Sequence, residues 1–193
     1  MQRDDWYETV RDPAELPAPA LIGRKAGERA IARLKARKVP TAQVPVLFES
    51  GVAASLMGHF VGAVSGGSLY RKSSFLLDSL GKQIFAPCVQ MTDFPHIPKA
   101  LASGAFDEEG VATQQRDIVK DGVVQGYFLA SYSARKLGMK STGNAGGNHN
   151  LILQDTGEDF AALLKKLGTG LLVTEMMGQG VNAVTGDYSR GAA

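Results

Sequence analysis

The chain has 193 residues, of which 44% are hydrophobic and 21% charged, and its 21 basic and 19 acidic side chains give a formal net charge of +2. This size and composition predict a soluble globular protein with one or two packed cores. Because both charge signs are scattered along the chain, the composition favours neither a nucleic-acid partner nor a membrane.

The chain carries features of a protein from a reducing compartment. Cys88 is the only cysteine, so neither an internal disulfide nor a thiolate metal cage can form. The polar N-terminus does not read as a secretory signal. The longest apolar stretch, residues 51–64, is shorter than the roughly 20 residues that a membrane span requires. We therefore expect a cytoplasmic protein.

Helical periodicity and the positions of the prolines predict two helices and a short strand in the first third of the chain. A proline-containing connection at residues 12–19 precedes an amphipathic helix predicted over residues 22–38. Its dense Arg and Lys suit either a solvated helix face or attraction to phosphate or anionic lipid, and the solvated face is the favoured interpretation. A short apolar run at 44–49 predicts a buried strand, and the apolar residues 51–64 predict a helix enclosed by protein.

The sequence after residue 64 predicts mainly β-structure. Residues 70–80 suit a second helix or a bent segment, and the Asp121-Gly122 pair predicts a type I′ hairpin. A further helix is expected at residues 160–167, ended by Gly168. The predicted short strands lie at residues 83–86, 89–91, 117–120, 123–129 and 171–173.

These elements predict an α+β fold in two parts. Residues 1–43 would form the end of a preceding region, a linker and the amphipathic helix, and residues 44–193 a second domain rich in β-structure. Residues 186–193 look like a loop leading into another strand, so we expect the chain to be truncated at both ends.

The three histidines do not form a recognisable catalytic motif. His59 lies on the apolar helix, where a hydrogen-bonded core role is the usual one, and His96 lies in a proline-rich loop. His149 ends the glycine-rich run 141–150, which suits either a tight turn or backbone binding of an anion or peptide carbonyl. The chain lacks the zincin spacing, the phosphate loop and the nucleophile elbow.

Four segments together resemble the PmbA/TldE branch of the TldD/PmbA metalloprotease family. They run from Gly58 to Lys82, from Ser131 to Gly138, from Ser141 to Asn150 and from Thr174 to Ala193. The resemblance covers essentially the whole chain and is weakest over its first forty residues. It implies the β-rich C-terminal-type domain of that family, without the N-terminal domain and the C-terminal end.

The resemblance implies a two-subunit peptidase that degrades unfolded peptides. The catalytic TldD-like subunit carries a His-Glu-x-x-x-His helix and completes its zinc site with a late cysteine. Here Ala54 and Ser55 take the first two positions and His59 the last, while residues 175–178 contain no cysteine. Alanine cannot bind zinc and serine cannot replace the carboxylate. The comparison thus implies a non-catalytic subunit, without a cofactor, whose TldD-like partner holds the zinc.

Glycine-rich backbone can hold an extended peptide as an added strand. We therefore expect peptide contacts from two segments, 141–149 and 178–190. The individual candidates are Ser141, Thr142, Gly146, Gly147, His149, Gly178, Gln179 and Arg190.

Two other functions stay open. One is a regulatory or scaffold protein of the DNA gyrase modulator type, with no role in hydrolysis. The other is an independent metallopeptidase that uses His59, His149 and carboxylates in an unrecognised arrangement.

Overall fold

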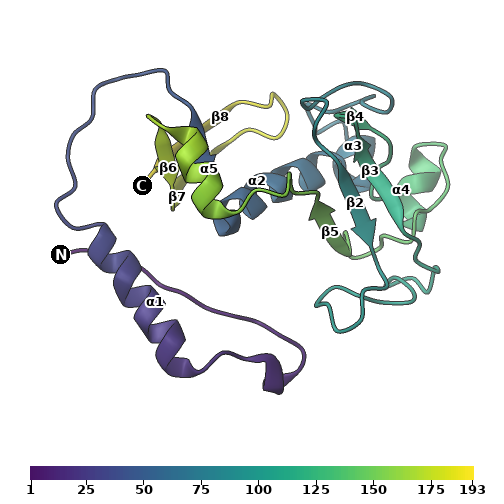
Figure 1. Ribbon diagram of the computed structural model, residues 1–193. Coiled ribbons are helices and arrows are strands. Elements are labelled where there is room, and N and C mark those ends of the chain that lie inside the picture. The colour runs from purple at the N-terminus through teal and green to yellow at the C-terminus, as the bar shows by residue number, and fades with distance from the viewer. The chain divides into compact units, whose positions relative to one another are not determined.

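A computed structural model describes all of residues 1–193 (Figure 1), and the chain divides into two compact units. The first comprises residues 1–43 and 98–101, and the second comprises residues 44–97 and 102–193. No helix is both long and apolar enough to cross a membrane. The proposed assignment of 1–43 and 44–193 to domains of a larger protein stays a prediction.

The first unit contains the short 3-10 helix η1 (Pro13–Glu15) and the helix α1 (Pro19–Ala32). The predicted basic helix is therefore present, but its bounds differ from 22–38. It begins at Pro19, whose fixed φ angle suits the first helical turn. It ends at Ala32, and Lys35 adopts a left-handed φ of 61° that a continuing helix cannot contain.

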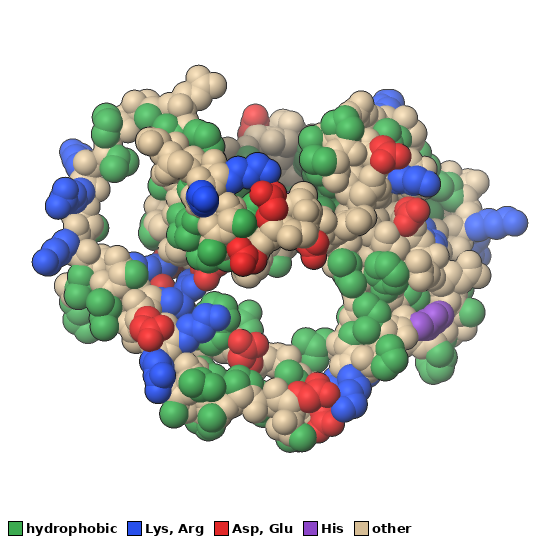
Figure 2. All heavy atoms as spheres, viewed as in Figure 1, with side chains coloured by type: hydrophobic (Ala, Val, Ile, Leu, Met, Phe, Trp, Pro, Cys, Tyr) green, Lys and Arg blue, Asp and Glu red, His purple; other side chains and the backbone are tan.

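Basic side chains of α1 and of Arg33, the residue that follows it, bind the N-terminal segment. Asp4 forms ion pairs with Arg29 at 3.3 Å and Arg33 at 3.0 Å. The Lys25 ammonium lies 3.3 Å from the centre of the Trp6 ring, a cation–π contact. Figure 2 shows basic and acidic side chains interspersed over the visible face of the molecule, as the scattered charges of the sequence suggest.

The second unit begins with the strand β1 (Val46–Phe48) and the helix α2 (Ser50–Ala63). Both were predicted, but neither is enclosed by this chain. Val46 is exposed, and on α2 only Phe60 and Ala63 are buried. The reason is that neighbouring elements cover only the C-terminal end of α2, so much of an apolar helix surface stays open.

Three sheets and three more helices complete the second unit and confirm the α+β class. The helices are α3 (Gly66–Tyr70), α4 (Ser131–Lys136) and α5 (Phe160–Leu167). A four-stranded antiparallel sheet has the order β4 (Val123–Val124), β3 (Arg116–Lys120), β2 (Met91–Phe94) and β5 (Asn150–Leu153). β1 pairs in parallel with β6 (Leu171–Val173), and β7 (Met176–Val181) pairs with β8 (Tyr188–Ala192) in antiparallel fashion.

The hairpin prediction is confirmed. Asp121 and Gly122 join β3 to β4 with φ angles of 52° and 76°, as a type I′ turn requires. The expected strand at 123–129 is shorter, however, because residues beyond Val124 leave the ladder. Phe128 instead exchanges backbone hydrogen bonds with Val64 and Gly66.

The sequence pattern predicts one further helix correctly and fails to predict several strands. Helix α5 has the predicted bounds 160–167, with Asp159 capping the Ala162 N–H and Gly168 turning at a φ of 57°. Residues 83–86 make only a single bridge, from Gln83 to Val123, so no strand forms there. Residues 71–80 form turns after α3, in agreement with the bent-segment alternative. The predicted terminal loop contains the strand β8, which the sequence pattern missed together with β5, β7 and α4.

The core lies where the end of α2 meets the four-stranded sheet and the segment after β4. It is built from Ile118, Val119 and Val124 of the sheet, packed with Phe60 and Leu129. These side chains are at most 5% exposed. This core fixes β2 and β3, and thereby the polar network at their ends.

Candidate functional site

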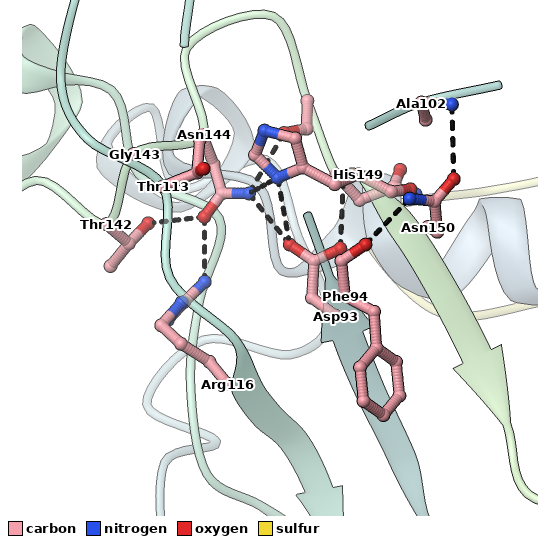
Figure 3. A network of polar contacts seen from close by, with 12 residues as sticks. Asp93, Phe94, Ala102, Thr113, Arg116, Thr142, Gly143, Asn144, His149 and Asn150 are labelled. Atoms are coloured by element: carbon pink, nitrogen blue, oxygen red, sulfur yellow. Dashed lines mark hydrogen bonds and ion pairs between the residues drawn. The ribbon is translucent and has the colours of Figure 1, made fainter. Parts of the chain in front are cut away.

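The glycine-rich run 141–150 leads from α4 to β5 and is anchored on Asp93 of β2, a carboxylate only 1% exposed (Figure 3). One Asp93 oxygen accepts the backbone N–H of His149 at 2.9 Å. The other accepts the Asn144 side-chain amide at 3.1 Å and lies 3.3 Å from His149 Nδ1. The carboxylate thus fixes both the loop and the start of β5.

Asn144 connects this carboxylate to the half-buried guanidinium of Arg116. Its Oδ1 accepts hydrogen bonds from Arg116 Nη2 at 2.8 Å and from the Thr142 hydroxyl at 2.9 Å. Burial lowers the pKa of the Arg116 guanidinium, and the negative charge of Asp93 opposes that change. An amide that donates to an anion and accepts from a cation links the two charges without direct contact (Figure 3).

Asp107 holds the outer side of the same loop. It is 6% exposed and accepts backbone hydrogen bonds from Ala145, Val111 and Glu109, each at 2.9 Å. Burial alone would raise the pKa of Asp107, but these three donors and the charge of His149 lower it below its usual value.

This lowered pKa predicts an acid-dependent loss of stability. A carboxyl group whose pKa is lower in the folded state stabilises the fold above its unfolded pKa, and loses that effect as the pH falls through the folded pKa. We expect Asp107→Asn to be less stable than the wild type at pH 7 and to lose less stability than the wild type between pH 5 and 2. Urea denaturation at several pH values measures this; parallel pH profiles would contradict it.

The structure brings five of the predicted peptide-binding residues into this loop. The hydroxyls of Ser141 and Thr142 interact with the Leu129 backbone, and a side chain at Gly146 would collide with Glu108. The Gly147 carbonyl accepts the Asn144 amide. Since these groups bond to the Leu129 backbone or within the loop, the role that the structure shows for them is to hold the loop that leads to His149 and β5. Their contact with a peptide stays a prediction.

The other three predicted residues belong to the β7–β8 hairpin. Gly178 has a φ of 85°, and Gln179 follows it within a register shift between Met177 and Gly180. The Arg190 guanidinium donates to the carbonyls of Met177 at 3.1 Å and Met176 at 3.3 Å. Peptide binding by this hairpin also stays a prediction.

The β7–β8 hairpin contacts α2, the helix on which Ala54, Ser55 and His59 take the positions of the zinc-binding motif. The Tyr188 ring packs edge-on against the ring of His59, with centroids 5.5 Å apart. The Nδ1 atom of His59 is buried and has no hydrogen-bond partner. Ala54 and Ser55, one helical turn earlier, remain exposed.

An apolar depression of about 490 Å³ runs along α2 opposite β5, and we call it the α2–β5 groove. Apart from Ser50 and Asn148, its lining residues carry no polar side chains. The residues that line it are Ser50, Ala53, Ala54, Met57, Gly58, Val61, Met91, Asn148, Leu151 and Leu153. Ala54 therefore forms part of an apolar wall.

The sequence analysis missed Asp93, Asn144 and Arg116, and it missed the groove. The sequence does contain a signal for Asp93. In the strand Met91–Phe94, Asp93 lies two residues after Met91, so both side chains point to the same, buried face of the strand. A carboxylate at an inward position predicts buried partners. Those partners come from distant segments, which no local pattern specifies.

Comparison with known proteins identifies the family. Residues 41–193 match the PmbA/TldA metallopeptidase C-terminal domain. The chain belongs to the PmbA/TldD metalloprotease family. It is 54% identical to the metalloprotease PmbA of Escherichia coli O157:H7, over all of this chain and 43% of that protein. Identity to the TldD homologue of Haemophilus influenzae is 32%, over 72% of this chain and 29% of that protein. The predicted PmbA/TldE branch is thus confirmed.

Solved structures of this family have the same fold. A crystal structure from Bacteroides thetaiotaomicron, described as a putative modulator of DNA gyrase, superposes with a TM-score of 0.91 at 32% identity, over 97% of this chain and 42% of that one. TldE from Thermococcus kodakarensis superposes at 0.66 with 24% identity, over 81% of this chain and 39% of that one. The chain spans less than half of the length of these PmbA/TldD relatives.

Proposed function

We propose that this chain is part of the non-catalytic subunit of a cytoplasmic, heterodimeric zinc metallopeptidase that acts on unfolded peptides. A TldD-like partner subunit would supply the zinc and the catalytic base. The main observation in support of the proposal is which residues occupy two positions of α2. Ala54 and Ser55 stand where the resemblance places the first histidine and the glutamate of the catalytic motif.

The surroundings of these residues do not fit a zinc ion. The Ser55 hydroxyl donates to the Val52 carbonyl of its own helix at 2.7 Å, and the Ala54 methyl group lines the groove. No group of three or more His, Cys, Asp or Glu side chains is placed to share a metal ion. Zinc in proteins is held by such side chains, usually three or four of them. Ala54 and Ser55 would therefore hold no metal for catalysis.

The peptidase assignment is tested with the complete gene product that contains residues 1–193. We expect it to bind no stoichiometric zinc and to leave an unfolded peptide intact when alone. Addition of a TldD-like subunit should produce cleavage faster than that subunit achieves alone, with zinc in the partner. Zinc content by metal analysis and cleavage by mass spectrometry measure this.

Two outcomes would contradict the proposal. Zinc-dependent cleavage by this protein alone, abolished by His59→Ala or His149→Ala, would favour an independent metallopeptidase. An unchanged rate of partner cleavage would favour a regulatory or scaffold role, the class named in the gyrase-modulator descriptions of similar structures.

A further inference from the structure

The turn between β3 and β4 contains a dipeptide that can react with itself. Asp121-Gly122 is the only Asp-Gly pair of the chain, and the chain contains no Asn-Gly pair. In such a pair the glycine nitrogen can attack the aspartate side chain, because glycine carries no side chain that hinders the approach. The product is isoaspartate, in which the main chain runs through the side-chain carbon atoms. The dipeptide that forms this turn is therefore also a potential site of covalent modification.

The modification takes place in two steps and uses only water. In the first step the Gly122 nitrogen bonds to Cγ of the neutral Asp121 carboxyl group, the Cγ–OH bond breaks, and water leaves with the amide proton, which gives a cyclic imide. In the second step water adds to the imide carbonyl that was the main-chain carbonyl of Asp121, and the bond from that carbon to the nitrogen breaks. The first step requires that the nitrogen reaches Cγ and releases its proton.

The backbone of the turn keeps these two atoms apart. Asp121 and Gly122 have φ angles of 52° and 76°, and they are the two central residues of a type I′ turn. In this turn ψ of the first central residue is about +30°. The Gly122 nitrogen then lies nearly anti to Cβ of Asp121, so it cannot reach Cγ unless the peptide group between the two residues rotates.

Hydrogen bonds to the segment before β2 oppose that rotation. The Gly122 N–H donates to the Val89 carbonyl at 3.0 Å, and this bond also holds the proton that the reaction must remove. The Gly122 carbonyl accepts the N–H groups of Ile84 and Phe85, each at 3.0 Å. Gly122 is buried, and an added Cβ atom would collide with the Phe85 carbonyl oxygen. The peptide group is therefore held from both sides.

Gln90 holds the other reacting group. Its side-chain amide donates to Asp121 Oδ1 at 2.6 Å, and its side-chain carbonyl accepts the Asp121 main-chain N–H at 3.0 Å. The two bonds join one glutamine side chain to both the side chain and the backbone of Asp121. Rotation of the carboxyl group toward the Gly122 nitrogen would break the first of them.

We propose that Asp121-Gly122 is a latent isoaspartate site, which Gln90 and the Val89 carbonyl keep unmodified as long as the turn stays closed. Every group involved belongs to the second unit, and the reaction takes place within one dipeptide. A two-residue type I′ turn has no room for an additional main-chain atom, so modification would disrupt the pairing of β3 with β4. The inference is independent of the proposed peptidase role.

Two matched glutamine substitutions test the role of Gln90. Gln90→Ala removes both side-chain bonds to Asp121 and leaves the main-chain bonds of the turn in place. Gln125→Ala removes a glutamine side chain that follows the same hairpin and donates instead to the Val123 carbonyl at 3.2 Å. The wild type unfolded in guanidinium chloride gives the rate of the dipeptide without any of these restraints.

The assay incubates the complete gene product at neutral pH and physiological temperature, and mass spectrometry of its peptides quantifies isoaspartate at residue 121 over time. We expect the native wild type to accumulate it much more slowly than the unfolded chain. Gln90→Ala should accumulate it about tenfold faster than the native wild type, because two lost hydrogen bonds raise the population of the open turn by roughly that factor. Gln125→Ala should stay within about twofold of the wild type, since it keeps both bonds to Asp121. Equal rates in the folded and unfolded wild type, or equal rates in the two variants, would overturn the inference.

Discussion

Replacement of Asp93 by alanine is expected to lower the free energy of unfolding by about 2–6 kcal/mol, because two donors lose their buried acceptor at a cost of about 1–3 kcal/mol each. Asp93 is 1% exposed and accepts the His149 N–H and the Asn144 amide. Without it, both donors lose their acceptor and the guanidinium of Arg116 loses a nearby negative charge. Urea denaturation of the complete gene product measures the change.

Asp117 provides a matched control on the adjacent strand. It is also a carboxylate of the same sheet, but it is exposed, and it accepts a hydrogen bond from the Thr92 hydroxyl at 2.8 Å. Asp117→Ala should therefore cost only about 1 kcal/mol, the typical contribution of one hydrogen bond. Similar losses in the two variants would show that the buried network contributes little stability.

Local sequence signals specified the parts of the fold that depend on neighbouring residues. Asp121-Gly122 predicted its hairpin because the left-handed φ angles of the turn select these residue types. Asp159 and Gly168 delimit α5 because a side-chain cap and a left-handed glycine end a helix through local bonds. Those signals require no knowledge of distant segments.

Burial was harder to predict because it depends on what lies opposite a surface. The composition of α2 predicted an enclosed helix, yet Ala54, Gly58 and Gly62 are exposed in this chain. Apolar composition indicates that a surface can be buried, but not which segment covers it. The missed strand β5 follows the same logic, since Asn150–Leu153 pairs with β2 more than fifty residues earlier.

The candidate site could be anticipated only in part. The run 141–150 was singled out for its glycines and His149, and the structure shows that it is built around Asp93 and Asn144. The substitutions at Ala54 and Ser55 were visible in the sequence, because they concern residue identity rather than geometry. The groove could not be foreseen, because its two walls come from α2 and β5, distant segments whose pairing no local pattern encodes.

Gly122→Ala tests how closely the β3–β4 hairpin packs on the segment before β2. The glycine has a φ of 76°, and an added Cβ atom would collide with the Phe85 carbonyl oxygen and lie 2.6 Å from that of Ala86. The left-handed conformation costs alanine about 1–2 kcal/mol, and overpacking against the backbone costs about 1–3 kcal/mol more. We expect a total loss of about 3 kcal/mol in urea denaturation.

Gly110→Ala separates the two contributions. Gly110 has a similar φ of 77°, but a Cβ atom there would meet nothing within 4 Å. It should therefore lose only the conformational part, about 1–2 kcal/mol. A larger loss for Gly122→Ala would demonstrate the collision, and it would mean that the hairpin bonds from Gly122 to Ile84, Phe85 and Val89 hold the backbone in place. Equal losses would mean that this segment shifts freely to accept a methyl group.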